Sequence, residues 1–328
     1  EQHKEAYGTE INYAAVCLSK IYEFINYSHS QRLDIIKKFT KLLLHYGVIY
    51  SDTSLNNKIN IIDSLNILQE ICINIDYDII FRCFIILCDL NKDNLSYKLL
   101  TLKWHKLKCI IKLLPFSDKP IKIFHEDARD TSFIDSIADF VITSPPYINV
   151  FNYHQQYRAS SEYLNGSVLP SAQAEIGSNR KNRSNRFFTA TQYCIDMALV
   201  FNELNRICKN NSQIIFIVGR ESLVKKTNFR NGEIVTEIAC ACCNMKLINR
   251  QERVFINRYG SNIYEDILYF KSTKQLINSL NKVKKLANIL LNNILQYVPQ
   301  DLKEDLKIAI NKIDEIQPSS FYSRIRIK

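Results

Sequence analysis

The sequence lacks a hydrophobic stretch long enough to cross a bilayer, because its longest apolar runs, such as residues 79–87, are short and contain Arg82. No signal-peptide pattern opens the chain. Its ten cysteines, scattered among apolar runs, therefore predict free thiols in a reducing cytoplasm rather than a disulfide framework. With 46% hydrophobic residues in 328, we expect a globular protein with one large core or two smaller ones.

Metal-binding patterns are also scarce. Cys240 and Cys243 have C-x-x-C spacing, but no second pair lies at zinc-site distance, and their segment has the pattern of a buried helix. The six histidines show no ligand spacing, so we expect His125 and His154 to pack or to form hydrogen bonds. No metal site is expected.

Positive charge is concentrated in two segments, although the whole chain has a net charge of +10. Residues 180–186 contain four basic residues and no acid, and residues 271–328 contain eleven basic and five acidic residues. Clustered lysine and arginine neutralise phosphates, which indicates a polyanionic partner. A solvated basic face is the alternative.

The order of the predicted elements indicates an α/β fold. Residues 7–12 predict a strand and residues 13–25 a helix, which we assign to residues 1–24 as the start of the main domain. Helical patterns, broken by turn residues, then predict an all-helical insertion over residues 25–118 with a possible role in target recognition. They lie at residues 33–46, 59–75 and 77–90.

From residue 119 to 273, short β-rich runs alternate with helical patterns, which is typical of a doubly wound parallel sheet. The expected strands are 121–125, 140–143, 213–218, 246–254 and 266–270, and the expected helices are 191–208 and 233–244. Residues 274–328 have the pattern of basic helices that end in an Arg/Lys tail.

Residues 139–147, Asp-Phe-Val-Ile-Thr-Ser-Pro-Pro-Tyr, predict a strand that runs into a rigid turn. Pro145 and Pro146 cannot continue a ladder and fix an extended corner at the carboxyl end of the strand, where open parallel sheets bind ligands. Ser144 Oγ and the Pro145 carbonyl could accept hydrogen bonds from the two N–H groups of a base's exocyclic amine, while Tyr147 stacks on the ring. An ordinary strand with a Pro-Pro turn is the alternative interpretation.

The stretch Thr143-Ser144-Pro145-Pro146-Tyr147 resembles the S-P-P-Y signature of amino-group DNA methyltransferases, in particular the N4-cytosine type. The resemblance implies a class I, Rossmann-like methyltransferase fold, S-adenosyl-L-methionine as cofactor and a flipped cytosine as substrate. It assigns catalysis to Ser144 through Tyr147 and places Thr143 beside the cofactor.

Two other stretches are similar to cofactor motifs of the same family. In Gly8-Thr9-Glu10-Ile11-Asn12, the resemblance implies that Glu10, next to Ile11, accepts hydrogen bonds from the ribose hydroxyls. In Glu126-Asp127-Ala128-Arg129, it implies that Asp127 binds the adenine amino group and that Ala128 leaves room for the ring. A carboxylate after a strand is as often a helix cap or a solvated loop residue.

The family's glycine-rich first motif should lie shortly before Glu10, and nothing in residues 1–7 matches it. Its absence would leave a gap between the strand at residues 7–12 and the strand at 140–143, with unpaired backbone groups on both sides. We therefore expect that strand and its glycine loop to come from upstream sequence or from a separate polypeptide that completes a split enzyme.

The residues expected to contact nucleic acid follow the corner or lie in basic stretches. Phe151 and Tyr157 belong to an aromatic, polar segment and could equally pack inward on an amphipathic helix. Arg220 could equally form a structural pair with Glu221. The expected base and phosphate contacts are Asn149, Tyr153, Arg158, Arg180, Lys181, Arg183, Arg186 and Arg220.

The sequence thus predicts a DNA cytosine-N4 methyltransferase that belongs to a restriction-modification or similar defence system. Three alternatives stay open: a DNA adenine-N6 methyltransferase, an RNA guanine-N2 methyltransferase, and a non-catalytic DNA-recognition subunit. The missing glycine loop is the feature that keeps the last of these open.

Overall fold

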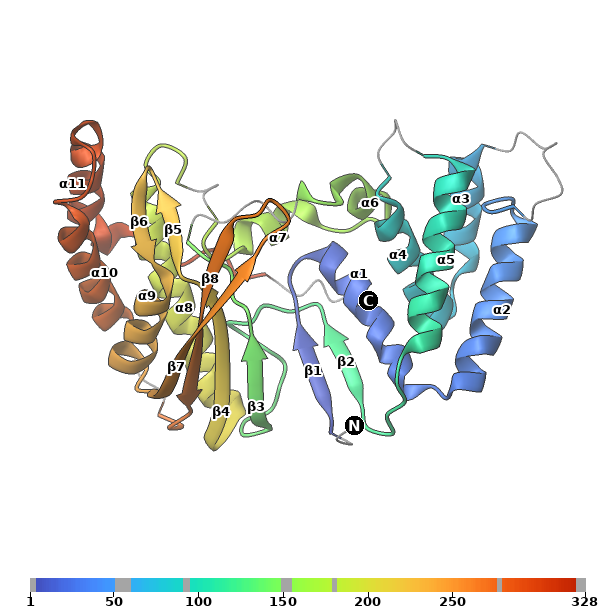
Figure 1. Ribbon diagram of the computed structural model, residues 1–328, viewed down its shortest axis with the longest axis horizontal. Coiled ribbons are helices and arrows are strands. Elements are labelled where there is room, and N and C mark those ends of the chain that lie inside the picture. Colours follow the sequence, from blue (N-terminus) through green and yellow to red (C-terminus); the bar gives the residue numbers. More distant parts are fainter. Residues whose placement is uncertain are drawn as a thin grey trace. The chain divides into compact units, whose positions relative to one another are not determined.

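The computed structural model describes residues 4–50, 60–90, 95–148, 155–178, 182–275 and 279–322 (Figure 1). The chain divides into two compact units. The first, here the helical unit, combines Glu1–His125 with Tyr153–Ser171, and the second, the sheet unit, combines Glu126–Asn152 with Ala172–Lys328. Each unit has its own cluster of buried apolar side chains.

A two-stranded parallel sheet begins the helical unit. Strand β1 (Ala6–Thr9) pairs with β2 (Ile121–Phe124). Both predicted strands are confirmed, but the first ends at Thr9, before the predicted end at residue 12. The reason is local: the Asn12 side chain accepts the N–H groups of Ala14 and Ala15 and so begins a helix at Tyr13.

The helices predicted up to residue 90 are present, with small shifts at their ends. Several begin at a side-chain cap; at α2, Ser28 and Gln31 form a reciprocal capping box. Phe39, Phe84 and Trp104 are completely buried among these helices. The elements are α1 (Tyr13–Lys20), a 3-10 turn (Ile21–Asn26), α2 (His29–His45), α3 (Ile61–Ile71), α4 (Ile75–Cys88), α5 (Tyr97–Leu113) and α6 (Arg158–Tyr163).

The sheet unit contains a four-stranded mixed sheet with the order β3-β4-β8-β7 (Figure 1). Its strands are β3 (Ala138–Thr143), β4 (Cys208–Gly219), β7 (Lys246–Ile256) and β8 (Asn262–Lys271). Only the β3–β4 pair is parallel, so the α/β sheet is mixed, whereas the alternating pattern predicted a parallel sheet. A short turn, closed by the Asn257 N–H and the Ser261 carbonyl, joins β7 to β8, and such a connection requires antiparallel strands.

One face of this sheet is covered by helices that share its core. Phe201 of α8 (Phe187–Ile207) stacks on Phe216 of β4, with ring centroids 4.9 Å apart. Val283 and Leu291 are completely buried in the same cluster, so the helix that carries them packs into the core of this unit. The other helices are α9 (Asn231–Glu237), a π-helical turn (Ile238–Cys242), α10 (Leu280–Ile294) and α11 (Lys303–Asn311).

Three further elements complete the chain. The hairpin of β5 (Glu221–Val224) and β6 (Thr227–Arg230) was not expected from the sequence. Helix α7 (Val168–Ala174) crosses the boundary between the units. Among the described residues, none of the helices is both long and apolar enough to span a membrane.

Strands β1 and β3 each have one edge without a neighbouring strand among the described residues, as do β2 and β7 at the other side of the same sheets. β1 pairs only with β2, and β3 pairs only with β4. On β3 the alternate side chains Phe140 and Ile142 are 50% and 60% exposed, although both are apolar. Parallel strands normally lie inside a sheet with both faces covered. An edge without a neighbouring strand presents unpaired backbone N–H and C=O groups, which are available for pairing with another strand.

Candidate active site at the Ser144–Tyr147 corner

The corner of residues Ser144–Tyr147 leaves the sheet at the carboxyl end of β3. Ser144 is exposed, Pro145 is buried, and Pro146 and Tyr147 are half-buried. Thr143 aligns with Phe216 of the parallel strand β4, so the carboxyl end of β4 lies at the same sheet edge. The structure thus leaves the serine accessible while its neighbours anchor the turn.

Two glycines fix the position of Tyr147. A Cβ added to Gly219 would lie only 2.9 Å from Cε2 of the Tyr147 ring. Gly177 has φ = +74°, and a Cβ there would collide with the Tyr147 carbonyl oxygen. Both positions therefore require glycine, a function that sequence reasoning missed; a glycine at the end of an apolar strand was the only available signal.

The turn after β4 is held by hydrogen bonds around Asn231. The Asn231 side-chain amide donates to the Gly219 carbonyl and to Ser222 Oγ, both at 2.9 Å. Its backbone N–H donates to the Arg220 carbonyl, also at 2.9 Å, and the Arg220 N–H donates to the Tyr264 carbonyl at 3.0 Å. Gly219 is consequently a fixed surface against which the Tyr147 ring rests.

Tyr193 of α8 lies beside this arrangement and was not predicted. Its Cδ2 is 3.3 Å from the point where a Cβ added to Gly177 would lie, and Tyr193 is completely buried. Within the described part of the chain its hydroxyl has no hydrogen-bond partner. Burial raises the pKa of Tyr193 well above its usual value, so the hydroxyl stays protonated as a possible donor.

Glu10 and Ile11 follow β1 in the helical unit. Glu10 is half-buried, and its Oε1 accepts the Asn12 N–H at 2.7 Å. Burial raises the pKa of Glu10, although the N–H groups of Asn12 and Ile11 oppose that shift. The Ile11 carbonyl lies 2.9 Å from His125 Nε2 and accepts the Ser171 hydroxyl at 2.7 Å, which fixes the backbone beside Glu10.

Asp127 belongs to the sheet unit and takes part in a buried ionic network. Its Oδ1 accepts the backbone N–H and the Nε–H of Arg129, at 3.0 and 2.9 Å. Its Oδ2 accepts Arg129 Nη2–H at 2.6 Å and the Tyr322 N–H at 3.0 Å. Burial alone would raise the pKa of Asp127, but these bonds and the Arg129 charge together hold it below its usual range.

Four hydrogen bonds use the acceptor positions of a carboxylate, so Asp127 has none left for an adenine amino group in this conformation. The predicted adenine contact would require the Tyr322 N–H to leave. Ala128, between Asp127 and Arg129, is exposed. Arg129, which sequence reasoning had left without a role, organises the loop.

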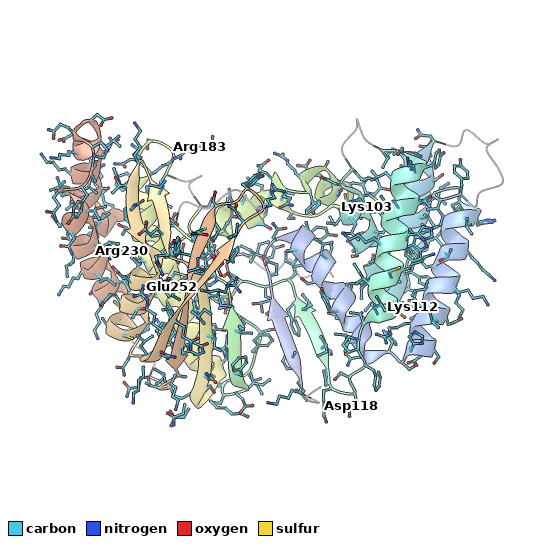
Figure 2. The ribbon with its side chains drawn as sticks, viewed as in Figure 1. Lys103, Lys112, Asp118, Arg183, Arg230 and Glu252 are labelled. Carbon is cyan, nitrogen blue, oxygen red and sulfur yellow. The ribbon has the colours of Figure 1, made fainter. Side chains whose placement is uncertain are left out.

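The predicted nucleic-acid contacts have different surroundings. Arg183 and Arg186 are exposed, and Arg183 is labelled in Figure 2. Arg158 pairs with Glu162 at 2.7 Å on an exposed helix. Arg220 forms a pair, as the alternative interpretation held, but with Glu252 rather than Glu221. Four of the predicted contacts lie outside the described residues: Asn149, Tyr153, Arg180 and Lys181.

A cavity of about 520 Å³ has Arg220, the residue after Gly219, in its lining. Its arginines already have acidic partners: Arg250 pairs with Asp266 at 3.0 Å, and Arg230 pairs with Glu233 at 2.9 Å. The wall therefore has little unbalanced positive charge. The lining residues are Arg220, Glu221, Arg230, Glu233, Arg250, Gln251, Glu252 and Asp266.

The cysteines of the C-x-x-C segment lie in or next to the π-helical turn. Cys243 is completely buried, and burial raises its pKa to about 12. A protonated thiol is a poor metal ligand. Across the described ranges, no three His, Cys, Asp or Glu residues are placed to hold a metal ion.

Comparison of the sequence with protein-family models and with curated proteins finds no match. Among solved structures, the chain is similar to a crystal structure titled as SAM-dependent methyltransferases from Methanosarcina mazei. The TM-score is 0.28 and the sequence identity 10%, over 51% of this chain and 76% of that one.

Proposed function

We propose that this chain is the larger part of an S-adenosyl-L-methionine-dependent methyltransferase that methylates the exocyclic N4 of a flipped cytosine in DNA. One observation carries the proposal. An exposed Ser144 and a diproline turn stand at the carboxyl end of a parallel strand, next to a tyrosine ring that rests on Gly219. That edge is where open α/β sheets bind their substrates.

The corner's own groups can prepare an amine for attack. The lone pair of a base's exocyclic nitrogen is delocalised into the ring, and acceptors on its N–H bonds help to localise it. Ser144 Oγ and the Pro145 carbonyl oxygen are the acceptors, and Tyr147 holds the plane of the base by stacking. Serine is a poor base at neutral pH, so the surplus proton leaves to water.

The bound cofactor would supply an electrophilic methyl group on a sulfonium. Glu10, half-buried after β1, fits the ribose hydroxyls because it is a carboxylate acceptor next to the fixed Ile11 backbone. Ala128 and Thr143 would contact the cofactor, and Ala128 has the small, exposed side chain needed. Asp127 fits only after Tyr322 moves, because its acceptor positions are filled.

The strand order supports the proposal that one strand of the sheet comes from polypeptide outside residues 1–328. In the family's class I sheet, the glycine-rich strand lies between the strand that corresponds to β1 and the one that corresponds to β3. Both β1 and β3 have an open edge among the described residues, as β2 and β7 do on the other side of their sheets. We propose that polypeptide outside residues 1–328, upstream or in a separate chain, supplies this strand and its glycine loop.

Mass spectrometry of nucleosides tests the function. DNA from cells that express this chain with its neighbouring coding sequence should contain N4-methylcytosine, and Pro146→Ala should abolish it. Pro299→Ala changes another half-buried proline, at the start of a surface turn, and should leave methylation unchanged. N6-methyladenine alone would contradict the cytosine assignment, methylated tRNA alone would favour an RNA enzyme, and full methylation with Pro146→Ala would indicate a non-catalytic subunit.

A further inference from the structure

The helical unit has an uneven distribution of charge that the net charge of the chain hides. Helices α2 and α5 together contain Arg32 and eight lysines against one acid, Asp34. Helices α3 and α4 contain four acids against one arginine. The positive charge is thus concentrated on two of the four long helices.

These two helices are direct neighbours. The Trp104 indole of α5 donates to Thr40 Oγ1 of α2 at 3.2 Å, and the Phe39 and Trp104 rings lie 5.3 Å apart. Their apolar sides face the core, so their lysines lie at the surface or at its border. Figure 2 labels two of them, Lys103 and Lys112, on α5. We name the whole set the lysine face: Lys37, Lys38, Lys41, Lys98, Lys103, Lys106, Lys108 and Lys112.

The lysine side chains of this face repel one another. Lys37 and Lys41 are four residues apart, as are Lys108 and Lys112, and like charges at that helical spacing destabilise a helix. Lys38–Asp34, at 2.6 Å, is the one ion pair that the structure gives between this face and a described acid. A surface whose charge repulsion is not offset by acidic residues of the same protein is typical of a surface that binds a polyanion.

We infer that the lysine face binds the phosphate backbone of duplex DNA, an inference that rests on the proposed DNA methyltransferase function. From Lys98 to Lys112, α5 is about 21 Å long, which equals the rise of about six base pairs of duplex. Lysine contacts phosphates as a point charge and reads no base sequence. The face therefore holds DNA without specifying a target.

A lipid surface is the competing partner, because Leu102 and Leu113 are 64% and 80% exposed on α5. Membrane-bound amphipathic helices insert an apolar face, however. The apolar face of α5 is already buried in the helical unit through Leu100, Trp104, Leu107 and Ile111. On α2, Leu33 and Leu44 are also exposed, at 39% and 40%. On each helix the two exposed leucines are eleven residues apart and form no continuous apolar stripe for insertion, so the geometry favours nucleic acid.

The test measures binding of the full chain to a fluorescent 25-base-pair duplex at several salt concentrations, without a methyl donor. The variant changes Lys98, Lys106 and Lys112 to Gln, all three being exposed. Affinity should fall about tenfold at 0.1 M salt, and the slope of log K against log salt should become shallower by about two to three, since each phosphate contact contributes about 0.9.

Two controls separate charge at this face from charge in general. Changing Lys209, Lys226 and Lys246 to Gln removes the same charge from exposed positions of the sheet unit outside the basic segments and should leave affinity within about twofold. Arginine at positions 98, 106 and 112 keeps the charge and should retain binding. Thermal melts confirm that each variant is folded.

An unchanged salt slope in the Gln variant, or an equal loss in the sheet-unit control, would overturn the inference. So would binding to phosphatidylserine vesicles that depends on the three lysines while DNA binding does not. Because the assay has no methyl donor, it measures DNA binding alone. Binding that does not depend on the three lysines would overturn this inference, whereas DNA without N4-methylcytosine in the nucleoside analysis would contradict the proposed function.

Discussion

Glu10 and Asp127 illustrate how two carboxylates in similar sequence settings acquire different surroundings. Each comes shortly after a strand of the same parallel pair, β1 or β2, and each matches a cofactor motif. Asp127 is 4% exposed and accepts four hydrogen bonds. Glu10 is half-buried, and its Oε1 accepts the nearby Asn12 N–H.

The pKa values of the two groups move in opposite directions. Burial raises the pKa of Glu10, whereas Arg129 and the Tyr322 N–H outweigh burial at Asp127 and lower its pKa. A carboxylate with a raised pKa lacks compensation for its charge and gains from a hydrogen-bond donor on a ligand. Asp127 therefore organises its loop, whereas the ribose contact proposed for Glu10 would supply a further donor to a carboxylate whose charge is poorly compensated.

Removing Arg129 should have the largest effect on this contrast. Its guanidinium bonds to Asp127, to Asp196 at 2.7 Å and to the Ser319 and Ser320 carbonyls. Arg129→Leu leaves two buried carboxylates without their cation and should lower the free energy of unfolding by about 3–5 kcal/mol. Urea unfolding measures this loss.

The matched control is Arg158→Leu, which removes an exposed arginine paired with Glu162 on one helix. That change should cost about 0.5 kcal/mol or less. Equal losses in the two variants would show that the buried network contributes no more than a surface pair, and the contrast between Asp127 and Glu10 would fail with it.

Asp127→Asn should have an intermediate effect. The amide keeps the shape but loses the charge and places an NH₂ group opposite the donors of Arg129 and Tyr322. Hydrogen bonds to charged groups contribute about 1.5–3 kcal/mol, so we expect a loss of that size in urea unfolding. If Asp127 were a ligand-binding residue instead, the variant would unfold like the wild type and lose only cofactor binding.

The sequence predicted most of the strands and helices because alternation and helical spacing are local patterns. The rigid turn at Ser144–Tyr147 after a strand was likewise predicted because its two prolines are adjacent in the sequence, and its catalytic role stays a prediction. The role of Arg129 was not predicted, since its partners Asp196 and Ser319 lie 67 and 190 residues away. Gly219 and Tyr193 were missed for the same reason: their contacts with the corner exist only after the sheet has formed.

The pH dependence of stability should separate the two carboxylates. The pKa of Asp127 is below its ordinary 3.8, so its contribution is complete above that value and is lost as pH falls through the lower, folded-state pKa. The pKa of Glu10 is above its ordinary 4.5, so its charge reduces stability at neutral pH, and that cost disappears as pH falls through the raised value.

Urea unfolding at steps from pH 7 to pH 3 measures both effects as differences from the wild type. The Asp127→Asn difference should shrink below pH 4, and the Glu10→Gln difference should shrink between neutral pH and about pH 4.5. A Glu10→Gln difference that grew on acidification would mean that Glu10 is held as a charge in the folded state, like Asp127.

Glu10→Gln should have the smallest effect on folding and a clear effect on ligand binding. Because ionised Glu10 is poorly compensated, the neutral amide should raise the free energy of unfolding by about 0.5 kcal/mol or leave it unchanged. A carboxylate that accepts ribose hydroxyls would lose about 1.5–3 kcal/mol of binding, or roughly ten- to hundredfold in affinity for S-adenosyl-L-methionine in the completed enzyme. Isothermal titration of the completed enzyme measures this loss, and unchanged affinity together with unchanged stability would remove Glu10 from the site.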